Sequence, residues 1–190
     1  MWYAESLLPF VSKSLAAFNV QSVDAFLLRL QEQPPLYDWK PIQIDGVLRL
    51  TRIVFVGLLL AISGLMLRKK TVGDLKGILY LELSVVLCLA LIISPISWTH
   101  YYLFLLVPFS LYLGGRLPVP QSRNWFLGVV VCILLVSPPV VFVNPSSTFL
   151  GNSLGKILIS HYVFGALLLW AILCAAKRYI AQASHTPFPS

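Results

Sequence analysis

Apolar residues are arranged along the chain in long blocks that short polar stretches separate. A helix needs about 20 residues, at a rise of about 1.5 Å each, to cross a bilayer. Five blocks approach this length and predict membrane-spanning helices at about 47–67, 77–94, 98–113, 125–143 and 157–176. The connections between these blocks are short, which favours antiparallel packing of successive helices. The pattern predicts an all-α fold, a polytopic transmembrane bundle of about five spans within residues 47–190.

Residues 1–46 have a different pattern and do not form a span. Within 20–31, one helical face carries the apolar residues Val23, Phe26, Leu27 and Leu30. Polar residues occupy other positions, so this segment predicts an amphipathic helix that lies in the membrane interface. The sequence Gln33-Pro34-Pro35 ends that helix. We therefore expect residues 1–46 to form an outer-face loop with an interfacial helix.

The composition excludes a soluble globular protein. Hydrophobic residues make up 58% of the chain and charged residues 11%, whereas ordinary soluble domains carry about 25% charged residues. The cysteines Cys88, Cys132 and Cys174 each lie inside an apolar block, where a thiol behaves as a small hydrophobic group. No glycine-rich phosphate loop and no Cys/His set with metal spacing occurs. We expect no cofactor and no metal site.

The basic residues predict the orientation in the membrane. The net charge is +7, and Lys and Arg of membrane proteins gather in cytoplasmic loops. One side of the predicted bundle carries Arg68, Lys69, Lys70, Lys76, Arg116, Arg123, Lys177 and Arg178. We expect this side and the C-terminus to be cytoplasmic. Residues 1–46, the 94–98 turn and the 144–156 loop then lie outside. The charge is explained by membrane topology, so we expect no nucleic-acid partner.

A polar hairpin between the second and third spans carries the sharpest local feature. Its sequence is Ser94-Pro95-Ile96-Ser97-Trp98-Thr99-His100-Tyr101-Tyr102. Pro95 ends one helix, and Ser97 or Thr99 can cap the next. His100 then lies in the first turn of a helix at the mouth of the bundle. It could act as a base or bind a phosphate or sugar hydroxyl, or it could be an interfacial histidine among aromatic residues.

Other charged and polar residues within the spans have two interpretations each. Arg49 and Arg52 share a helix face at the outer end of the first span, where they could bind a lipid phosphate or extend to headgroups. We expect Glu82 to be structural, since its carboxylate can reach the interface or pair with Arg68 or Lys69. His161, which begins the fifth span, is also expected to be structural. Kinks are expected at Pro108 and at Pro138-Pro139.

Two segments resemble one known family. The hairpin, which runs into Leu103-Phe104-Leu105-Leu106-Val107-Pro108, resembles the Ser-Pro-Ile-Ser-Trp-x-His-His/Tyr hairpin of the family-87 glycosyltransferases. These are polytopic enzymes of the GT-C class, and they include bacterial mannosyltransferases that use polyprenyl-phosphate sugars. Asn19-Val20-Gln21-Ser22 followed by Arg29 is similar to that family's Asn-x-x-Ser…Arg segment. Together the resemblance covers most of residues 15–115.

The resemblance implies a function and a set of site residues. It implies an integral protein of the bacterial plasma membrane that transfers a hexosyl group, on the outer face, from a polyprenyl-phosphate sugar. Its partners would be the lipid-linked donor and membrane lipids. His100 would be the catalytic histidine near the donor phosphate. The implied substrate-binding residues are Arg49, Arg52, Trp98, Ser97, Asn19, Gln21, Ser22 and Arg29.

One departure from the family pattern concerns the catalytic acid. GT-C enzymes carry it in the first outer loop, after the first span, and no predicted span precedes residues 1–46. The outer acids Asp24, Asp38 and Asp45 do not match that motif position. We expect this chain to be the C-terminal part of a longer enzyme, with an N-terminal half as a further partner. The alternatives are a non-catalytic membrane subunit or lipid-binding scaffold, and a small transporter, which the absence of inverted repeats disfavours.

Overall fold

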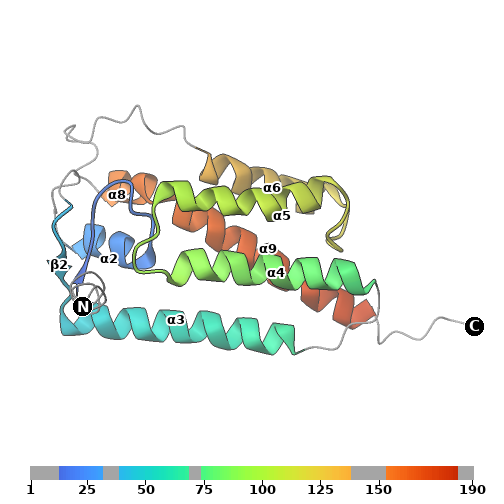
Figure 1. Ribbon diagram of the computed structural model, residues 1–190, viewed down its shortest axis with the longest axis horizontal. Helices are drawn as coiled ribbons and strands as arrows, with labels where there is room; N and C mark the ends of the chain where they lie inside the picture. The colour runs from blue at the N-terminus through green and yellow to red at the C-terminus, as the bar shows by residue number, and fades with distance from the viewer. Residues whose placement is uncertain (1–12, 32–38, 69–73, 138–152, 184–190) are drawn as a thin grey trace, which may run out of the picture.

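The computed structural model describes residues 13–31, 39–68, 74–137 and 153–183, and these confirm the predicted all-α fold (Figure 1). The helices are α2 (Val23–Gln31), α3 (Gly46–Leu67), α4 (Leu75–Ile93), the 3-10 helix η2 (Thr99–Leu105), α5 (Leu106–Leu113), α6 (Arg123–Val136), α8 (Ser153–Ile159) and α9 (His161–Ala183). Strands β1 (Lys13–Ser14) and β2 (Ile42–Gln43) form a two-residue antiparallel ladder.

Three of these helices are long and apolar enough to cross a membrane, namely Gly46–Leu67, Leu75–Ile93 and His161–Gln182. Two shorter apolar helices, Thr99–Leu113 and Arg123–Val136, occupy the positions of the predicted third and fourth spans. The first three blocks begin within two residues of the observed helices. The predicted fourth span continues past residue 137, and that part lies outside the described residues, together with Pro138-Pro139.

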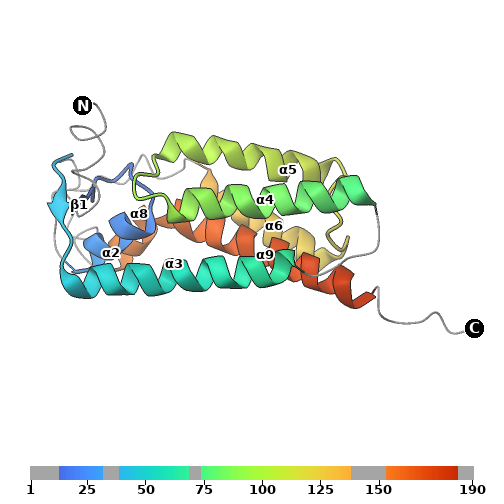
Figure 2. The same ribbon diagram turned by 60° about the horizontal axis from the view of Figure 1, so that its bottom comes forward.

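The long helices run side by side along the long axis of the molecule (Figures 1 and 2). One end, which we call the hairpin end, carries α2, α8, the β1–β2 ladder and the 94–98 turn. The other end carries Arg68 after α3 and Arg116 after α5, Lys76 and Arg123 at the starts of α4 and α6, and Arg178 in the last part of α9. We call it the basic end. Successive helices thus alternate in direction, as the short connections predicted.

The core lies where α9 packs between α4 and α6. A Cβ atom at Gly165 would lie 2.7 Å from Val136 Cγ1 and 2.9 Å from Leu135 Cβ, so the absence of a side chain permits the close approach of α6 and α9. The three cysteines are buried free thiols in this core, as predicted for small hydrophobic groups. By contrast, α3 is peripheral, and only 11% of its apolar stretch is buried within the protein.

A partly buried ion pair joins α4 and α9 near the basic end and bears on two predictions. Lys177 Nζ lies 2.6 Å from Glu82 Oε1, and the Lys177 side chain is 2% exposed. Glu82 was expected to reach the interface or to pair with Arg68 or Lys69, and its partner is Lys177. The fifth span was expected to end at about residue 176, with Lys177 after it, but the helix continues to Ala183. Pairing with a carboxylate 95 positions away allows the lysine to stay inside the helix.

The third span changes its helix type along its length. Residues Thr99–Leu105 form a 3-10 helix and Leu106–Leu113 an α-helix, so the change comes just before Pro108. Proline is tolerated in the first turn of an α-helix, where its missing N–H costs no internal hydrogen bond. Near Pro108, where a kink was predicted, the structure has a change of helix type.

Candidate functional site

Two segments far apart in the sequence form a joint at the hairpin end. The Gln21 N–H donates to the Ser97 carbonyl at 2.5 Å, and the Thr99 N–H donates to the Asn19 carbonyl at 2.9 Å. Between them, Val20 pairs with Trp98 in an antiparallel bridge. These are the two segments that carry the family resemblance. The structure therefore brings Asn19, Gln21, Ser97 and Trp98 into direct contact through the backbone.

This joint replaces the helix cap that the sequence predicted. Trp98 occupies the N-cap position of η2 and makes no side-chain cap hydrogen bond. Neither Ser97 nor Thr99 caps the helix with its side chain, so that prediction was wrong. The carbonyl of Asn19 accepts the Thr99 N–H instead. A polar group at a helix start has to be satisfied, and here a distant segment satisfies it.

Gln21 connects the joint to the rest of the bundle. Its side-chain amide donates to the carbonyls of Phe18 and Ile159, both at 2.7 Å, and the second bond links it to α8. The Tyr102 hydroxyl donates to the Gln21 carbonyl at 2.7 Å. Gln21 is 1% exposed, so these bonds are inside the protein and hold its position tightly.

Arg29 holds the same segment from the side of α2. Its guanidinium donates to the carbonyls of Ala17 at 3.0 Å and Val20 at 3.1 Å, and the residue is 0% exposed. Burial lowers the pKa of Arg29 to about 9, and the nearby Tyr102 hydroxyl opposes this shift. The side chain stays charged at neutral pH and fixes the backbone of residues 17–20.

The helix α2 exists as predicted, and it buries Val23 of the predicted apolar face together with two charged residues. Leu30 on the predicted apolar face is 41% exposed, whereas Asp24 and Arg29 are buried. Ser22 begins the helix, since its side-chain oxygen accepts the Ala25 N–H at 3.1 Å. Because Arg29 binds carbonyls and Asp24 binds an arginine of α3, the polar side of α2 is drawn against the bundle. The helix therefore packs on α3 and α8.

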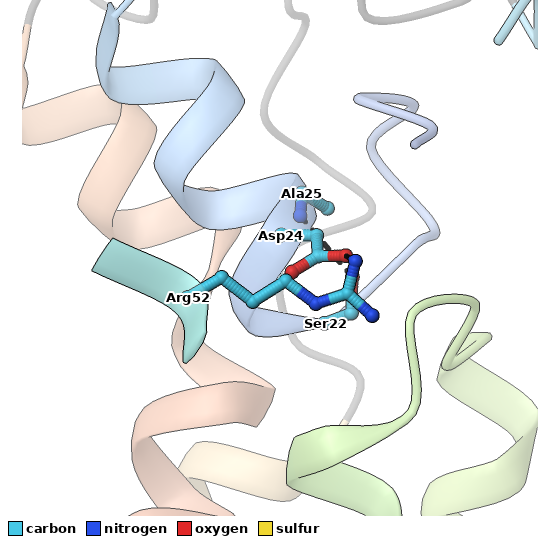
Figure 3. Close-up of polar contacts among 4 residues, drawn as sticks. All are labelled: Ser22, Asp24, Ala25 and Arg52. Atoms are coloured by element: carbon cyan, nitrogen blue, oxygen red, sulfur yellow. Dashed lines mark hydrogen bonds and ion pairs between the residues drawn. The ribbon is translucent and has the colours of Figure 1, made fainter. Parts of the chain in front are cut away.

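The two arginines predicted to bind phosphate have different environments. Arg52 Nη1 lies 3.2 Å from Asp24 Oδ2, and their side chains are 26% and 4% exposed (Figure 3). Arg49 is exposed. The structure therefore engages Arg52 in an ion pair between α2 and α3 and leaves Arg49 at the surface.

The Asp24–Arg52 pair predicts a pH dependence of stability. Burial raises the pKa of Asp24 above its ordinary value of 3.8, and the charge of Arg52 only partly opposes this. The folded protein thus binds more protons at this site than the unfolded chain as pH rises from 3.8. We expect stability, measured by thermal unfolding in detergent, to fall as pH increases through this window.

Two substitutions check that expectation. Asp24→Asn should flatten the pH profile above pH 3.8 and should not lower the melting temperature at neutral pH, because the desolvation of the carboxylate is removed. Arg52→Gln should steepen the decline, because it removes the opposing charge. A profile that Asp24→Asn leaves unaltered would contradict the assignment to this carboxyl.

His100 lies at the edge of a pocket beside the joint. The residue is exposed, with its ring 4.6 Å from that of Tyr101 and 6.3 Å from that of Trp98. The pocket has a volume of about 410 Å³ and is lined by Thr99, His100, Tyr102, Leu103, Leu106, Phe109, Ile133, Val136, Ser137 and Tyr162. It is an apolar space with a few polar groups. Neither Arg49 nor Arg52 is among its described lining residues, so the structure does not bring them to His100.

Several buried polar atoms around the joint have no hydrogen-bond partner among the described residues. They include Ser14 Oγ, Gln21 Oε1, Arg29 Nε and Ser97 Oγ. An unsatisfied buried polar group costs about 1–3 kcal/mol. Such costs are expected at functional sites, where local rules of stability are broken for another purpose. The joint thus contains buried polar groups beside the apolar side chains of Leu15, Ala17 and Val20.

The remaining polar candidates have structural roles. Asp45 accepts the Leu48 N–H at 2.7 Å and caps α3, while Asp38 lies outside the described residues. His161 Nδ1 makes a short hydrogen bond to the carbonyl of Leu135, which supports the structural role expected for it. Within the described ranges, no group of three His, Cys, Asp or Glu residues could hold a metal ion.

Sequence reasoning missed Tyr102 and Tyr162, whose rings pack 5.3 Å apart and line the pocket. A partial signal in the sequence was that a His-Tyr dipeptide, His100-Tyr101 or His161-Tyr162, begins each of the two spans that carry these tyrosines. Comparisons with protein families, with curated proteins and with solved structures found no match to this chain.

Proposed function

We propose that this chain acts in a membrane glycosyltransferase reaction of the GT-C type, in which a hexosyl group passes from a polyprenyl-phosphate sugar to an acceptor on the outer face. One observation carries the proposal. The two segments that resemble the family-87 enzymes are hydrogen-bonded to each other, Gln21 to Ser97 and Asn19 to Thr99. Hydrogen bonding between the two segments is expected if both contribute residues to one site.

The pocket beside the joint suits an amphiphilic donor. Its apolar walls, from Leu103 to Phe109 and across to Ile133 and Val136, would take part of the lipid chain. Thr99, His100 and Ser137 are the groups that would bind its polar part. The 410 Å³ volume holds only a portion of a long polyprenyl chain, and the rest would remain in the bilayer.

The chemistry divides between the two ends of the reacting bond. The bond from the sugar's anomeric carbon to the phosphate oxygen breaks, and a bond to the acceptor oxygen forms. The phosphate leaves with the electron pair, and the acceptor proton passes to a base. We assign His100 to the phosphate end, where a hydrogen bond stabilises the developing charge. No carboxylate lines the described pocket, and we assign the base to none of these residues.

In this proposal Arg49 and Arg52 contribute less to donor binding than His100 does. Arg52 already pairs with Asp24, and its charge is partly neutralised there. Arg49 is exposed at the outer end of α3 and remains free to attract an anionic headgroup to that side of the protein.

A non-catalytic membrane subunit or lipid-binding scaffold is the second candidate function. The lack of a carboxylate along the described pocket lining favours it. The two functions differ in turnover, since a scaffold would bind a polyprenyl phosphate without consuming a polyprenyl-phosphate sugar.

Two measurements test the proposal together, namely sugar transfer in membranes and the side of the membrane on which the hairpin lies. Membranes from cells that produce the protein should move labelled sugar from a polyprenyl-phosphate donor to an acceptor, and membranes that lack it should not. Because the three native cysteines are buried, Tyr101→Cys provides a single exposed thiol in the hairpin. An impermeant thiol reagent should label it from outside the cell. Labelling only from inside, or equal transfer in both membranes, would overturn the proposal.

A further inference from the structure

The pocket beside the joint is polar at one end and apolar at the other. Thr99 begins η2, Ser137 directly follows α6, and Tyr162 is the second residue of α9, so these three lining residues lie at the hairpin end. Leu106 and Phe109 lie farther toward the basic end, on α5. A ligand with a polar head group and an apolar chain would therefore place its head group at the hairpin end.

Two tyrosines line this pocket, and they differ in what their hydroxyl groups bind. The rings of Tyr102 and Tyr162 pack edge to face, with 5.3 Å between their centroids. The Tyr102 hydroxyl donates to the Gln21 carbonyl at 2.7 Å. The Tyr162 hydroxyl has no hydrogen-bond partner among the described residues, although the residue is only 9% exposed. Because polar groups inside proteins are nearly always hydrogen-bonded, this hydroxyl is a group that a ligand in the pocket would satisfy.

The start of α9, which carries Tyr162, is held from two sides. The Gln21 side-chain amide donates to the Ile159 carbonyl at 2.7 Å, just before this helix. His161 Nδ1 is hydrogen-bonded to the carbonyl of Leu135, which attaches the helix to α6. A hydroxyl on such a fixed support loses little freedom when it binds a ligand, so its hydrogen bond contributes more to affinity.

Tyr162 differs in chemistry and position from the other polar groups at this end. The Ser137 hydroxyl donates to the Ile133 carbonyl at 2.6 Å, whereas the Thr99 hydroxyl and the His100 ring have no hydrogen bond within the described ranges. Thr99 and His100 are adjacent on η2, where we assigned His100 to the phosphate, and Tyr162 comes from α9. A phenol both donates and accepts a hydrogen bond, as a sugar hydroxyl does, whereas ionised phosphate oxygens only accept. Tyr162 is therefore matched to the sugar part of a head group.

We propose that the Tyr162 hydroxyl binds a hydroxyl of the donor's hexosyl group and makes the pocket select the sugar-bearing lipid over bare polyprenyl phosphate. This inference rests on the proposed function, because it requires that the pocket hold the lipid-linked donor. Bare polyprenyl phosphate is the product that transfer leaves behind, and it has the same chain and phosphate as the donor. Without a contact to the sugar, this product would compete for the pocket on nearly equal terms. Tyr162 is thus a specificity-determining residue.

The variant Tyr162→Phe tests this inference, because it removes the hydroxyl and keeps the ring. Wild type and variant are placed in phosphatidylcholine nanodiscs and titrated by calorimetry with polyprenyl-phosphate mannose, polyprenyl-phosphate glucose and polyprenyl phosphate. We expect wild type to bind at least one sugar-bearing lipid more tightly than polyprenyl phosphate. In Tyr162→Phe that affinity should fall roughly 10-fold, as for the loss of one hydrogen bond, and the affinity for polyprenyl phosphate should not change.

Two other tyrosine variants are matched controls. Tyr101→Phe removes a hydroxyl from an exposed tyrosine that does not line the described pocket, so it should change none of the three affinities. Tyr102→Phe loses the bond to the Gln21 carbonyl and should lower the melting temperature. Tyr162→Phe should leave the melting temperature unchanged, because its hydroxyl has no partner within the described part of the protein.

Four results would overturn the inference while the proposed function stands. Equal wild-type affinity for sugar-bearing and bare lipids would show that the pocket does not select the sugar. Equal weakening of both kinds of lipid in Tyr162→Phe would assign the hydroxyl to the phosphate, and unchanged binding of both would remove it from the site. A lower melting temperature in this variant would assign the hydroxyl a structural role. Wild-type protein that binds none of the three lipids would instead overturn the proposed function together with this inference.

Discussion

Replacing His100 by alanine is expected to reduce glycosyl transfer at least 100-fold while the protein still folds and inserts into the membrane. Hydrogen bonding or proton transfer by a positioned side chain typically contributes 10²- to 10⁴-fold to a rate. His100 is exposed, with its ring edge-on to that of Tyr101 and roughly parallel to that of Trp98, so its replacement by alanine opens no cavity in the core. The rate of label transfer in membranes and the melting temperature in detergent measure the two effects separately.

Two companion variants separate the possible roles of this histidine. Glutamine at position 100 keeps a hydrogen-bond donor but has no group that takes a proton at neutral pH. Activity that survives His100→Gln but not His100→Ala would assign the histidine to the phosphate. Loss in both would favour a base. Tyr101→Ala, at an adjacent exposed aromatic residue, should leave most transfer intact, and full transfer in His100→Ala would remove this residue from the mechanism.

The lengths of the apolar blocks predicted the helices well because crossing a membrane requires a fixed length of chain. The observed helix Gly46–Leu67 matches its block almost residue for residue. Helix ends were predicted less well wherever a long-range contact decides them. Lys177 remains inside α9 because Glu82, on a helix far earlier in the chain, pairs with it. The apolar block alone had indicated that the span ended before this lysine.

The hairpin end could be predicted only in part. The family resemblance implied Gln21, Arg29, Ser97 and His100 as site residues, but the sequence contained no signal for the bond between Gln21 and Ser97. That bond joins two backbone groups, and backbone groups carry no sequence information. The pairing of Arg52 with Asp24 was equally hidden, because it requires the polar side of α2 to turn toward α3.

Replacing Arg29 by methionine is the most destabilising substitution we expect at the hairpin end. The guanidinium is fully buried and donates to the carbonyls of Ala17 and Val20. Hydrogen bonds to charged groups contribute about 1.5–3 kcal/mol each, and the desolvation of the charge offsets part of that sum. We expect Arg29→Met to lower the free energy of unfolding by about 2–4 kcal/mol. Thermal or denaturant unfolding in detergent measures it.

The effect should also be local to the joint, which distinguishes it from general destabilisation. Without Arg29, residues 17–20 lose their attachment to α2, and the bonds from Gln21 to Ser97 and from Thr99 to Asn19 should open more often. Hydrogen exchange at the Gln21 and Thr99 amides should therefore accelerate more than exchange in α4 or α9.

Arg29→Lys and Arg49→Met complete this test. Lysine keeps a charge, but one compact ammonium group does not reproduce the planar fork that binds two carbonyls, so it should restore only part of the stability. Arg49 is exposed, and its replacement should change neither stability nor exchange at the joint. Unchanged protection of both amides in Arg29→Met would contradict this role of Arg29. The segment 17–21 would then be held to the hairpin by the bonds of Gln21 to Ile159 and of Tyr102 to Gln21, without the contribution of α2.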